Sequence, residues 1–494
     1  MIKEKKISER FVEIDALKKQ VNTKLAKMLD KESYEVKARP AIDFLTSDRL
    51  DLVPKIIYAK WFLHGVDTSY AERLYLAHIE TINGFVEADG TGKIGEEAFI
   101  QAFNRLISEI SQNGLSKRYP VPVSGTAILD GAHRTAIAIA LGLDLPTVEL
   151  SYPPHHIGYK ELSFGAIDSA QLDHIVFEYC LLKPSTRMVF IWPSAEGNRD
   201  EVERIFENYC QIVYRKEIDL SKNGQSNIVR LAYSKEAWLG TIGDGFIGAQ
   251  NKADWCFGRR GPVILYVIEP YDDLVSMKEE VRALFNIGKH SIHVNDSYQE
   301  TVELAQHLLN ANGLTFINNH TPENFTWFKT LFQHYKDWIV SNNLNVEDYC
   351  VDGSASMAAF GIREARDLDF ITRTGNYSDT GFKEIDCHDT ANLDYKCSLD
   401  ELIYNPENHF YYEGYKMISL YKLKEKKLSR SEGKDLLDVS LIEIKLSGAS
   451  TRSLPVKWRE LLRPIRLKAV LKFFALKLRF RLYKIFRFIC YFFS

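Results

Sequence analysis

The chain has 494 residues, of which 45% are hydrophobic, 12% aromatic and 26% charged, and its net charge is −3. The length predicts about three domains rather than one core, and the composition excludes a disordered or fibrous protein. No C-x-x-C pair occurs, which argues against a zinc finger or a disulfide framework. No apolar run is long enough to predict a signal peptide or a membrane-spanning helix.

Changes in pattern divide the chain into four regions. Residues 1–183 are mainly helical with a strand-turn-helix unit at 120–142, residues 186–312 alternate strands with helices, and residues 313–450 enclose a strand-rich stretch between helices. Residues 451–494 contain twelve Lys or Arg and one acid, a balance of +11 that leaves −14 on the rest. We therefore expect an α/β and α+β multidomain protein with a basic C-terminal helix.

The first candidate site lies at the start of a predicted helix, in the segment ILDGAHRTAIAIALG. His133 and Arg134 fall in the first turn, where the helix dipole disfavours cations unless an anion binds. A phosphate there would be held by Arg134 and by backbone N–H groups after Gly131. The alternative is a purely structural role, in which Asp130 only caps the helix.

This segment resembles the D/G-G-x-H-R turn of the ParB/sulfiredoxin fold, which includes CTP-binding partition proteins and kinases that use ATP. The resemblance implies a nucleotide site at Asp130, Gly131, His133 and Arg134, with Asp130 catalytic in the kinase-like members. Ala132 stands where sulfiredoxin has its cysteine nucleophile, so that chemistry is excluded. Upstream, Arg49, Asp51 and Lys55 have helical spacing and are expected to face the same pocket, with Arg49 and Lys55 as nucleotide contacts.

The order of predicted elements in residues 186–312 resembles the nucleoside diphosphate kinase fold, a ferredoxin-like sheet. The stretch SIHVNDS is similar to the turn that carries the family's catalytic histidine, which implies a catalytic His293. Arg282 and Lys278 would lie on the nucleotide side. Trp192 replaces the family's phosphate-binding lysine, so classical phosphate exchange is not expected. The alternative is a buried His293 that only holds the turn.

The third candidate site lies in YCVDGSASMAAFGIREARDLDFITR. Two acids at i and i+2 on a strand point to one face, so Asp367 and Asp369 are placed to share Mg²⁺ or Mn²⁺. Gly353 permits close approach of a triphosphate, and Ser354 offers a hydroxyl and an N–H at a helix start.

The pattern resembles the DNA polymerase beta-like nucleotidyltransferases, whose h-G-S is followed by D-h-D. The resemblance implies ATP or CTP as substrate and a third carboxylate on a later strand, for which Asp386 is preferred and Asp389 and His388 are rivals. It further implies phosphate contacts from Arg363 and from Lys434 in a helix that closes the site. The acidic body does not favour a nucleic-acid polymerase, so a small acceptor is expected.

The tail, RPIRLKAVLKFFALKLRFRLYKIFRFICYFFS, mixes cations with aromatic residues. Such a segment predicts attachment to an anionic membrane surface, with RNA or a partner groove as alternatives. We therefore expect a cytoplasmic protein, peripheral at the inner face of the membrane.

The combination of domains resembles multidomain proteins of capsule or O-antigen biosynthesis. The resemblance implies a nucleotidyltransferase or kinase acting on a sugar, polyol or glycan acceptor beside glycosyltransferases. Two alternatives remain open, a toxin-like enzyme that nucleotidylates a protein and a non-catalytic scaffold of nucleotide-binding folds.

Overall fold

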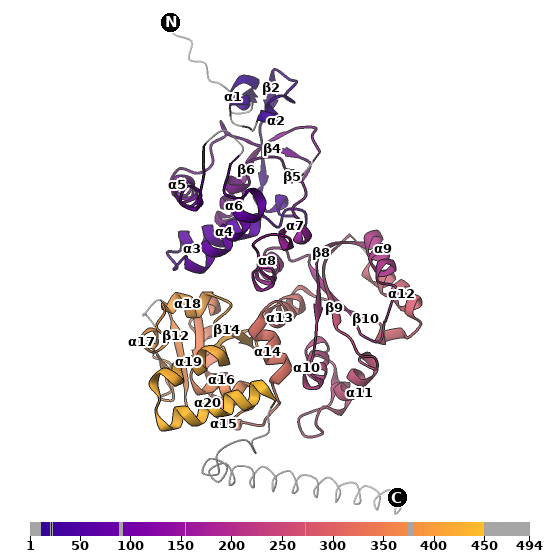
Figure 1. The fold of residues 1–494 in the computed structure, drawn as a ribbon, viewed down its shortest axis with the longest axis vertical. Coiled ribbons are helices and arrows are strands. Elements are labelled where there is room, and N and C mark those ends of the chain that lie inside the picture. Colours follow the sequence, from indigo (N-terminus) through magenta and orange to yellow (C-terminus); the bar gives the residue numbers. More distant parts are fainter. Residues whose placement is uncertain are drawn as a thin grey trace, which may run out of the picture. The chain divides into compact units, whose positions relative to one another are not determined.

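A computed structural model of the chain describes residues 11–19, 21, 23–87, 92–153, 155–271, 273–373, 379–388 and 390–448 (Figure 1). Within these residues no helix is long and apolar enough to cross a membrane. The predicted basic tail, 451–494, lies outside them, so its membrane attachment stays a prediction. The mixed α/β, multi-sheet organisation expected from the sequence is confirmed.

The chain divides into two compact units, each built from separate stretches of sequence. Unit 1 combines residues 1–219, 255–314 and 398–414, and unit 2 combines residues 220–254, 315–397 and 415–494. The domains expected with boundaries near 183–186 and 312–313 are continuous in sequence. Each compact unit instead combines three separate stretches of the chain. Periodicity reports local structure and carries no signal for such an arrangement.

The first part of unit 1 has two small sheets. Strand β1 (Phe11–Glu13) pairs with β2 (Ser33–Glu35). The larger sheet has the order β3-β6-β4-β5. Its strands are β3 (Lys37–Pro40), β4 (Val121–Ser124), β5 (Ala127–Ile128) and β6 (Asp144–Glu149). The expected strand-turn-helix unit at 120–142 is therefore confirmed.

Helices accompany these strands and enclose a buried core. They are α1 (Ile14–Lys18), α2 (Thr23–Ala26), α3 (Leu52–Leu63), α4 (Ser69–Asn83), α5 (Glu96–Asn113), α6 (Ala132–Leu141), α7 (Tyr159–Ser163) and α8 (Ser169–Leu182). Helix α3 is buried along most of its length, including the charged Lys55. Burying charge inside a helix is costly unless the charges are paired, and the pairing is described below.

The second part of unit 1 is an antiparallel sheet of order β10-β7-β9-β8. Its strands are β7 (Arg187–Ile191), β8 (Cys210–Ile218), β9 (Val263–Pro270) and β10 (Ile292–Val294), joined by α9 (Arg199–Tyr209) and α12 (Leu274–Phe285) and followed by α13 (Tyr298–Leu308). Alternate apolar residues of the strands pack against α9 and α12 in one core. Helix α18 (Leu399–Tyr404) and β14 (His409–Tyr412) also belong to unit 1.

Unit 2 is organised around strands in the order β13-β12-β11-β15. These are β11 (Tyr349–Asp352), β12 (Leu368–Thr372), β13 (Ile385–Cys387) and β15 (Tyr415–Ile418). Its helices include α10 (Lys222–Ala232), α15 (Thr326–Ser341), α16 (Ser354–Ala359), α17 (Ala391–Tyr395), α19 (Leu420–Arg430) and α20 (Gly433–Ser447). The boundary of the two units falls within α11 (Ile247–Cys256) and within α14 (Ala311–Asn319). The α19–α20 pair forms the yellow end of the described chain in Figure 1.

The two faces of this sheet differ in chemistry. On one face, the Phe370 ring lies 5.6 Å from Tyr335 and 5.2 Å from Trp338 of α15, and Leu368 and Phe370 are fully buried as predicted. The other face carries the aspartates, because Asp352 pairs with Asp369 and Asp369 pairs with Asp386 in register. Neighbouring residues in register point to the same side of a sheet.

Candidate functional site

Three aspartates from three adjacent strands form one row in unit 2. Asp352 ends β11, Asp369 lies in β12 and Asp386 lies in β13. Asp367 precedes β12 by one residue, and its Oδ1 accepts a 3.2 Å hydrogen bond from Ser354 Oγ. The sequence-predicted group of Gly353, Ser354, Asp367, Asp369 and Asp386 is thus brought to one end of one sheet face.

Asp369 is destabilised in its charged form. Burial raises the pKa of this carboxyl to about 6, and the neighbouring Asp367 charge adds to the rise. A carboxylate whose pKa is raised by burial and by a neighbouring acid marks a place where a cation would be stabilising. Asp386 is exposed, and its Oδ1 accepts from the Cys387 N–H at 2.9 Å.

The Gly353 turn is tightly constrained by this row. Its φ is +69° and ψ is −141°, and a Cβ placed there would lie 2.8 Å from Asp369 Oδ2. Glycine is required both for the backbone conformation and for the close approach.

Replacing Gly353 by Ala should therefore damage the site more than the fold. The substitution adds backbone strain of about 1–3 kcal/mol and pushes against the Asp369 carboxylate, so we expect loss of nucleotide binding with only a modest fall in melting temperature. Gly381→Ala is the matched control, since Gly381 has a φ of +74° but no neighbouring atom within 4 Å of the added Cβ. Equal effects of the two substitutions on binding would contradict this expectation.

Asp352 is the most thoroughly bound acid of the row. It is fully buried, and its carboxylate accepts from Lys426 Nζ at 2.6 Å, from the Gly353 N–H at 2.6 Å and from the Tyr395 hydroxyl. His388 Nδ1 lies 3.1 Å from the same carboxylate. Burial alone would raise the pKa of Asp352, but the bonds from His388, Lys426 and Tyr395 hold it well below its ordinary value.

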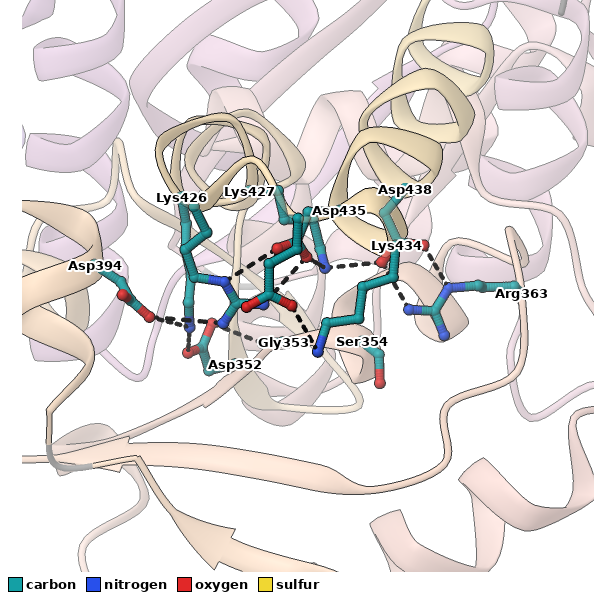
Figure 2. Close-up of polar contacts among 12 residues, drawn as sticks. Asp352, Gly353, Ser354, Arg363, Asp394, Lys426, Lys427, Lys434, Asp435 and Asp438 are labelled. Atoms are coloured by element: carbon teal, nitrogen blue, oxygen red, sulfur yellow. Dashed lines mark hydrogen bonds and ion pairs between the residues drawn. The ribbon is translucent and has the colours of Figure 1, made fainter. Parts of the chain in front are cut away.

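A chain of alternating charges continues from Lys426 along α19 and α20 (Figure 2). We call it the charge arc. Its links are Lys426–Asp394 (3.9 Å), Asp394–Arg430 (3.7 Å), Arg430–Asp435 (3.1 Å), Asp435–Lys427 (3.2 Å), Lys427–Asp438 (2.8 Å) and Asp438–Arg363 (2.8 Å). Asp435 is fully buried and Asp438 nearly so, so these pairs are more than loose surface contacts.

The predicted phosphate contacts of unit 2 differ in their surroundings. Both Nε and Nη2 of Arg363 donate to Asp438 at 2.8 Å, which fixes the plane of the guanidinium. Lys434 is exposed and lies 3.2 Å from Glu432. Of the two, only Arg363 belongs to the charge arc, while Lys434 lies on the surface beside it (Figure 2). Asp389, a rival for the third carboxylate, lies outside the described residues.

Sequence reasoning missed Lys426, Lys427, Asp435 and Asp438. A faint signal existed, because Lys426 and Lys427 follow the buried Leu423 by three and four residues and so share its helix face. Charged residues are usually solvated, and without the fold this spacing did not stand out.

In unit 1, the first predicted site lines a cavity of about 990 Å³. Asp130, Gly131, His133 and Arg134 form part of its wall together with Arg49, Asp51 and Lys55. Only Lys55 lies in α3, because Arg49 and Asp51 precede the helix, so the predicted helical spacing is not what brings them together. Apolar side chains, among them Ile79, Leu106 and Ile110, line it too. The cavity thus offers both charged and apolar surface to a ligand.

The buried charges at the start of α3 are paired with one another: Lys55 lies in the helix, Asp51 directly precedes it, and Arg49 lies two residues further upstream. Arg49 donates from Nε and Nη2 to the Asp51 carboxylate at 2.7 and 3.0 Å and from Nη1 to the Ile128 carbonyl at 2.7 Å. Lys55 Nζ donates to the Asp51 carbonyl at 2.9 Å and lies 3.0 Å from His78 Nε2. Burial lowers the pKa of Lys55 to about 8 against the opposing effect of Asp51. These donors contact groups within the protein, and the nucleotide contacts expected of Arg49 and Lys55 stay a prediction.

The turn residues are held as follows. Asp130 Oδ1 accepts from the Gly131 N–H at 2.6 Å, and Gly131, with a φ of +84°, is the residue that precedes α6. Arg134 Nη1 donates to the Tyr119 carbonyl at 2.5 Å. His133 Nε2 lies 2.9 Å from the Tyr75 hydroxyl, and its ring packs edge-on against Phe103 at 4.8 Å.

The buried histidines should make unit 1 sensitive to acid. Burial and the nearby Lys55 charge lower the pKa of His78 and His133 well below 6.5. Below about pH 6.5 the unfolded chain therefore binds protons that the folded chain does not, so stability is lost as the pH falls. We expect the melting temperature to fall between about pH 7 and pH 5, with a shallower slope in His133→Gln; an unchanged slope in that variant would count against this account.

His293 lies on β10, where its ring stacks on Phe190 of β7 at 5.6 Å. Trp192, which stands in place of the expected lysine, is fully buried and its ring lies 5.5 Å from Phe190. Lys278 Nζ lies 3.5 Å from Asp296, and Arg282 Nη1 donates to Glu279 at 2.5 Å. This packing places His293 against the Phe190 ring, which favours the alternative in which it holds the turn.

No protein-family model, curated protein or solved structure matches this chain in the comparisons made.

Proposed function

We propose that unit 2 catalyses metal-assisted nucleotidyl transfer from ATP or CTP to a small acceptor. The observation that carries the proposal is the juxtaposition of Asp367 and Asp369 with the Gly353–Ser354 turn at one end of one sheet face. A polyphosphate needs close backbone approach, and its reacting phosphorus needs charge neutralisation. Gly353 permits the close backbone approach, and the Asp367–Asp369 pair offers a position for the cation that neutralises the charge.

The residues present fit Mg²⁺ or Mn²⁺. Asp367 and Asp369 offer only oxygen donors, which these ions prefer, and the raised pKa of Asp369 indicates a position where a cation relieves repulsion. Among the described residues, no group of three or more His, Cys, Asp or Glu side chains is arranged for a metal. Two carboxylates suffice where substrate phosphates complete the ligand set, and Asp386 is the proposed third.

When bound, the metal would neutralise charge on the phosphates. The protein's own residues would act around it: Ser354 and the backbone of the Gly353 turn would contact the phosphates, and Arg363, oriented by Asp438, is proposed as a further phosphate contact. The oxygen of an acceptor hydroxyl would form a bond to the α-phosphorus as the bond to pyrophosphate breaks, and the hydroxyl proton would be released to water.

The remaining parts of the proposal rest on more general support. The cavity of unit 1 is proposed as a second nucleotide site at Asp130–Arg134, since charged and apolar walls suit a nucleoside phosphate. The β10-β7-β9-β8 order is the strand order of a ferredoxin-like sheet and supports that fold. The packing of His293 favours a structural role for it. Glycan synthesis and membrane attachment stay proposals that rest on the resemblance and on the tail.

The test uses ATP and CTP labelled at either the α- or the γ-phosphorus, incubated with Mg²⁺, the full chain and a cell extract. Nucleotidyl transfer places the α-label on an acceptor and leaves the γ-label in pyrophosphate. Label from the γ-phosphorus would instead indicate a kinase, and an α-labelled protein band would indicate protein modification. No transfer of either label would contradict the proposed activity.

A further inference from the structure

The Asp352–Lys426 pair lies directly behind the Gly353–Ser354 turn. Asp352 is held by four different groups, and one of them is the N–H of Gly353 itself at 2.6 Å. On its other side, the same glycine has only 2.8 Å between its missing Cβ and Asp369 Oδ2. The turn is therefore fixed from behind by Asp352 and limited in front by Asp369.

Lys426, on helix α19, is the lysine partner of Asp352 among the described residues. It is 3% exposed, its Nζ donates to Asp352 Oδ2 at 2.6 Å, and it sits 4.8 Å from the centre of the Tyr395 ring. Figure 2 shows it extending from α19 down to Asp352 beside Gly353. Ordering a long side chain this completely costs conformational entropy, and the bond to Asp352 offsets that cost.

Stability alone does not account for this arrangement. A buried ion pair often contributes little to stability compared with apolar residues of the same size, although breaking it is costly. The pair fixes the geometry of the turn. An ionised Asp352 accepts hydrogen bonds from all its donors at once, and this sets the direction of the Gly353 N–H. Through α19, the charge arc links this anchor to Asp438, which orients Arg363.

We propose that Lys426, acting through Asp352, is a positioning residue that sets the Gly353–Ser354 turn for the phosphates of the nucleotide. The inference rests on the proposed function for its purpose, but the positioning itself is a property of the protein without ligand. Lys426 touches neither the nucleotide nor the metal in this account.

The experiment compares Lys426→Met with Lys416→Met in the full chain. Lys416 is a matched control because it is a second buried lysine of unit 2, 5% exposed and 2.8 Å from Glu347, on strand β15 beside β11. Hydrogen exchange of the amides of residues 353–357 is measured without nucleotide, and MgATP and MgCTP affinities are measured separately. Melting temperatures report the general loss of stability in each variant.

We expect Lys426→Met to speed exchange at residues 353–357 and to weaken nucleotide affinity by about 10–100-fold, as loss of a supporting partner does at metal sites. Lys416→Met should lower the melting temperature without either effect, and Lys426→Arg should restore part of the affinity. If both methionine variants lose stability alike while the turn and the affinity stay unchanged, the pair is only structural and the inference is wrong.

A second variant covers the case in which Lys426→Met does not fold. Asp352→Asn combined with Lys426→Met removes both charges and so avoids an unpaired buried ion; we expect it to fold, with the turn still exchanging faster than in the wild type. Wild-type exchange in this variant would overturn the inference. If the wild type binds no nucleotide, the proposed function fails, yet exchange at the turn still decides the role of Lys426.

Discussion

Asp369→Asn is expected to reduce nucleotidyl transfer by about 100-fold or more while leaving the protein folded. Even outer partners of metal ligands are worth about 10–100-fold, and Asp369 is proposed as a direct ligand. Burial and Asp367 raise the pKa of Asp369 to about 6, so its charge is unfavourable in the absence of a cation. The neutral variant should therefore melt at or above the wild-type temperature without Mg²⁺.

The control is Asp337→Asn, which removes an exposed carboxylate from α15 on the opposite side of the sheet. It should leave both transfer and the effect of Mg²⁺ on melting unchanged. Mg²⁺ should raise the melting temperature of the wild type and of this control but not that of Asp369→Asn. Full transfer by Asp369→Asn would show that the carboxylate pair is not the catalytic centre.

Asp51→Asn is expected to produce the largest loss of stability in unit 1. Asp51 is 3% exposed, and its carboxylate is the counterion of both Arg49 and Lys55. Both cations would remain buried without it, and breaking a buried pair typically costs about 3–5 kcal/mol. Hydrogen exchange of α3 peptides, read beside the melting curve, should show the opening of this part of unit 1.

Asp43→Asn is the comparison, since Asp43 is an exposed acid eight positions earlier in the chain. It should leave exchange in α3 at the wild-type rate. If Asp51→Asn melts like Asp43→Asn, the Arg49–Asp51–Lys55 cluster is not the anchor of α3 described here. That result would also mean that the burial of Arg49, Asp51 and Lys55 in the cavity wall is not explained by a role in stability.

The sequence predicted local features of the candidate site well. Two strands joined by a Gly-Ser turn and a helix were expected around residues 349–373, and strands β11 and β12 with helix α16 lie there. The i, i+2 spacing predicted that Asp367 and Asp369 share one face; the register aligns Asp369 with Asp352 and Asp386, and Asp367 contacts Ser354 beside them. Such features depend on periodicity and turn chemistry, which act over a few residues.

Features that depend on distant contacts were not predictable in this way. Lys426 meets Asp352 across 74 positions of sequence, and the two units exchange segments such as 220–254. The phosphate contact expected of Arg363 stays a prediction, but the partner that orients its guanidinium, Asp438, lies 75 positions later and has no local signal. Propensity and patterning carry no information on which distant charges will pair when helices pack.

The central claim is tested most directly by calorimetric titration of the full chain with ATP and CTP, with and without Mg²⁺, beside Asp367→Asn/Asp369→Asn. The account predicts Mg²⁺-dependent binding to the wild type that disappears in the double variant. Binding that survives the substitution would move the nucleotide to the Asp130–Arg134 cavity of unit 1, and no binding to either protein would contradict a nucleotide-dependent function.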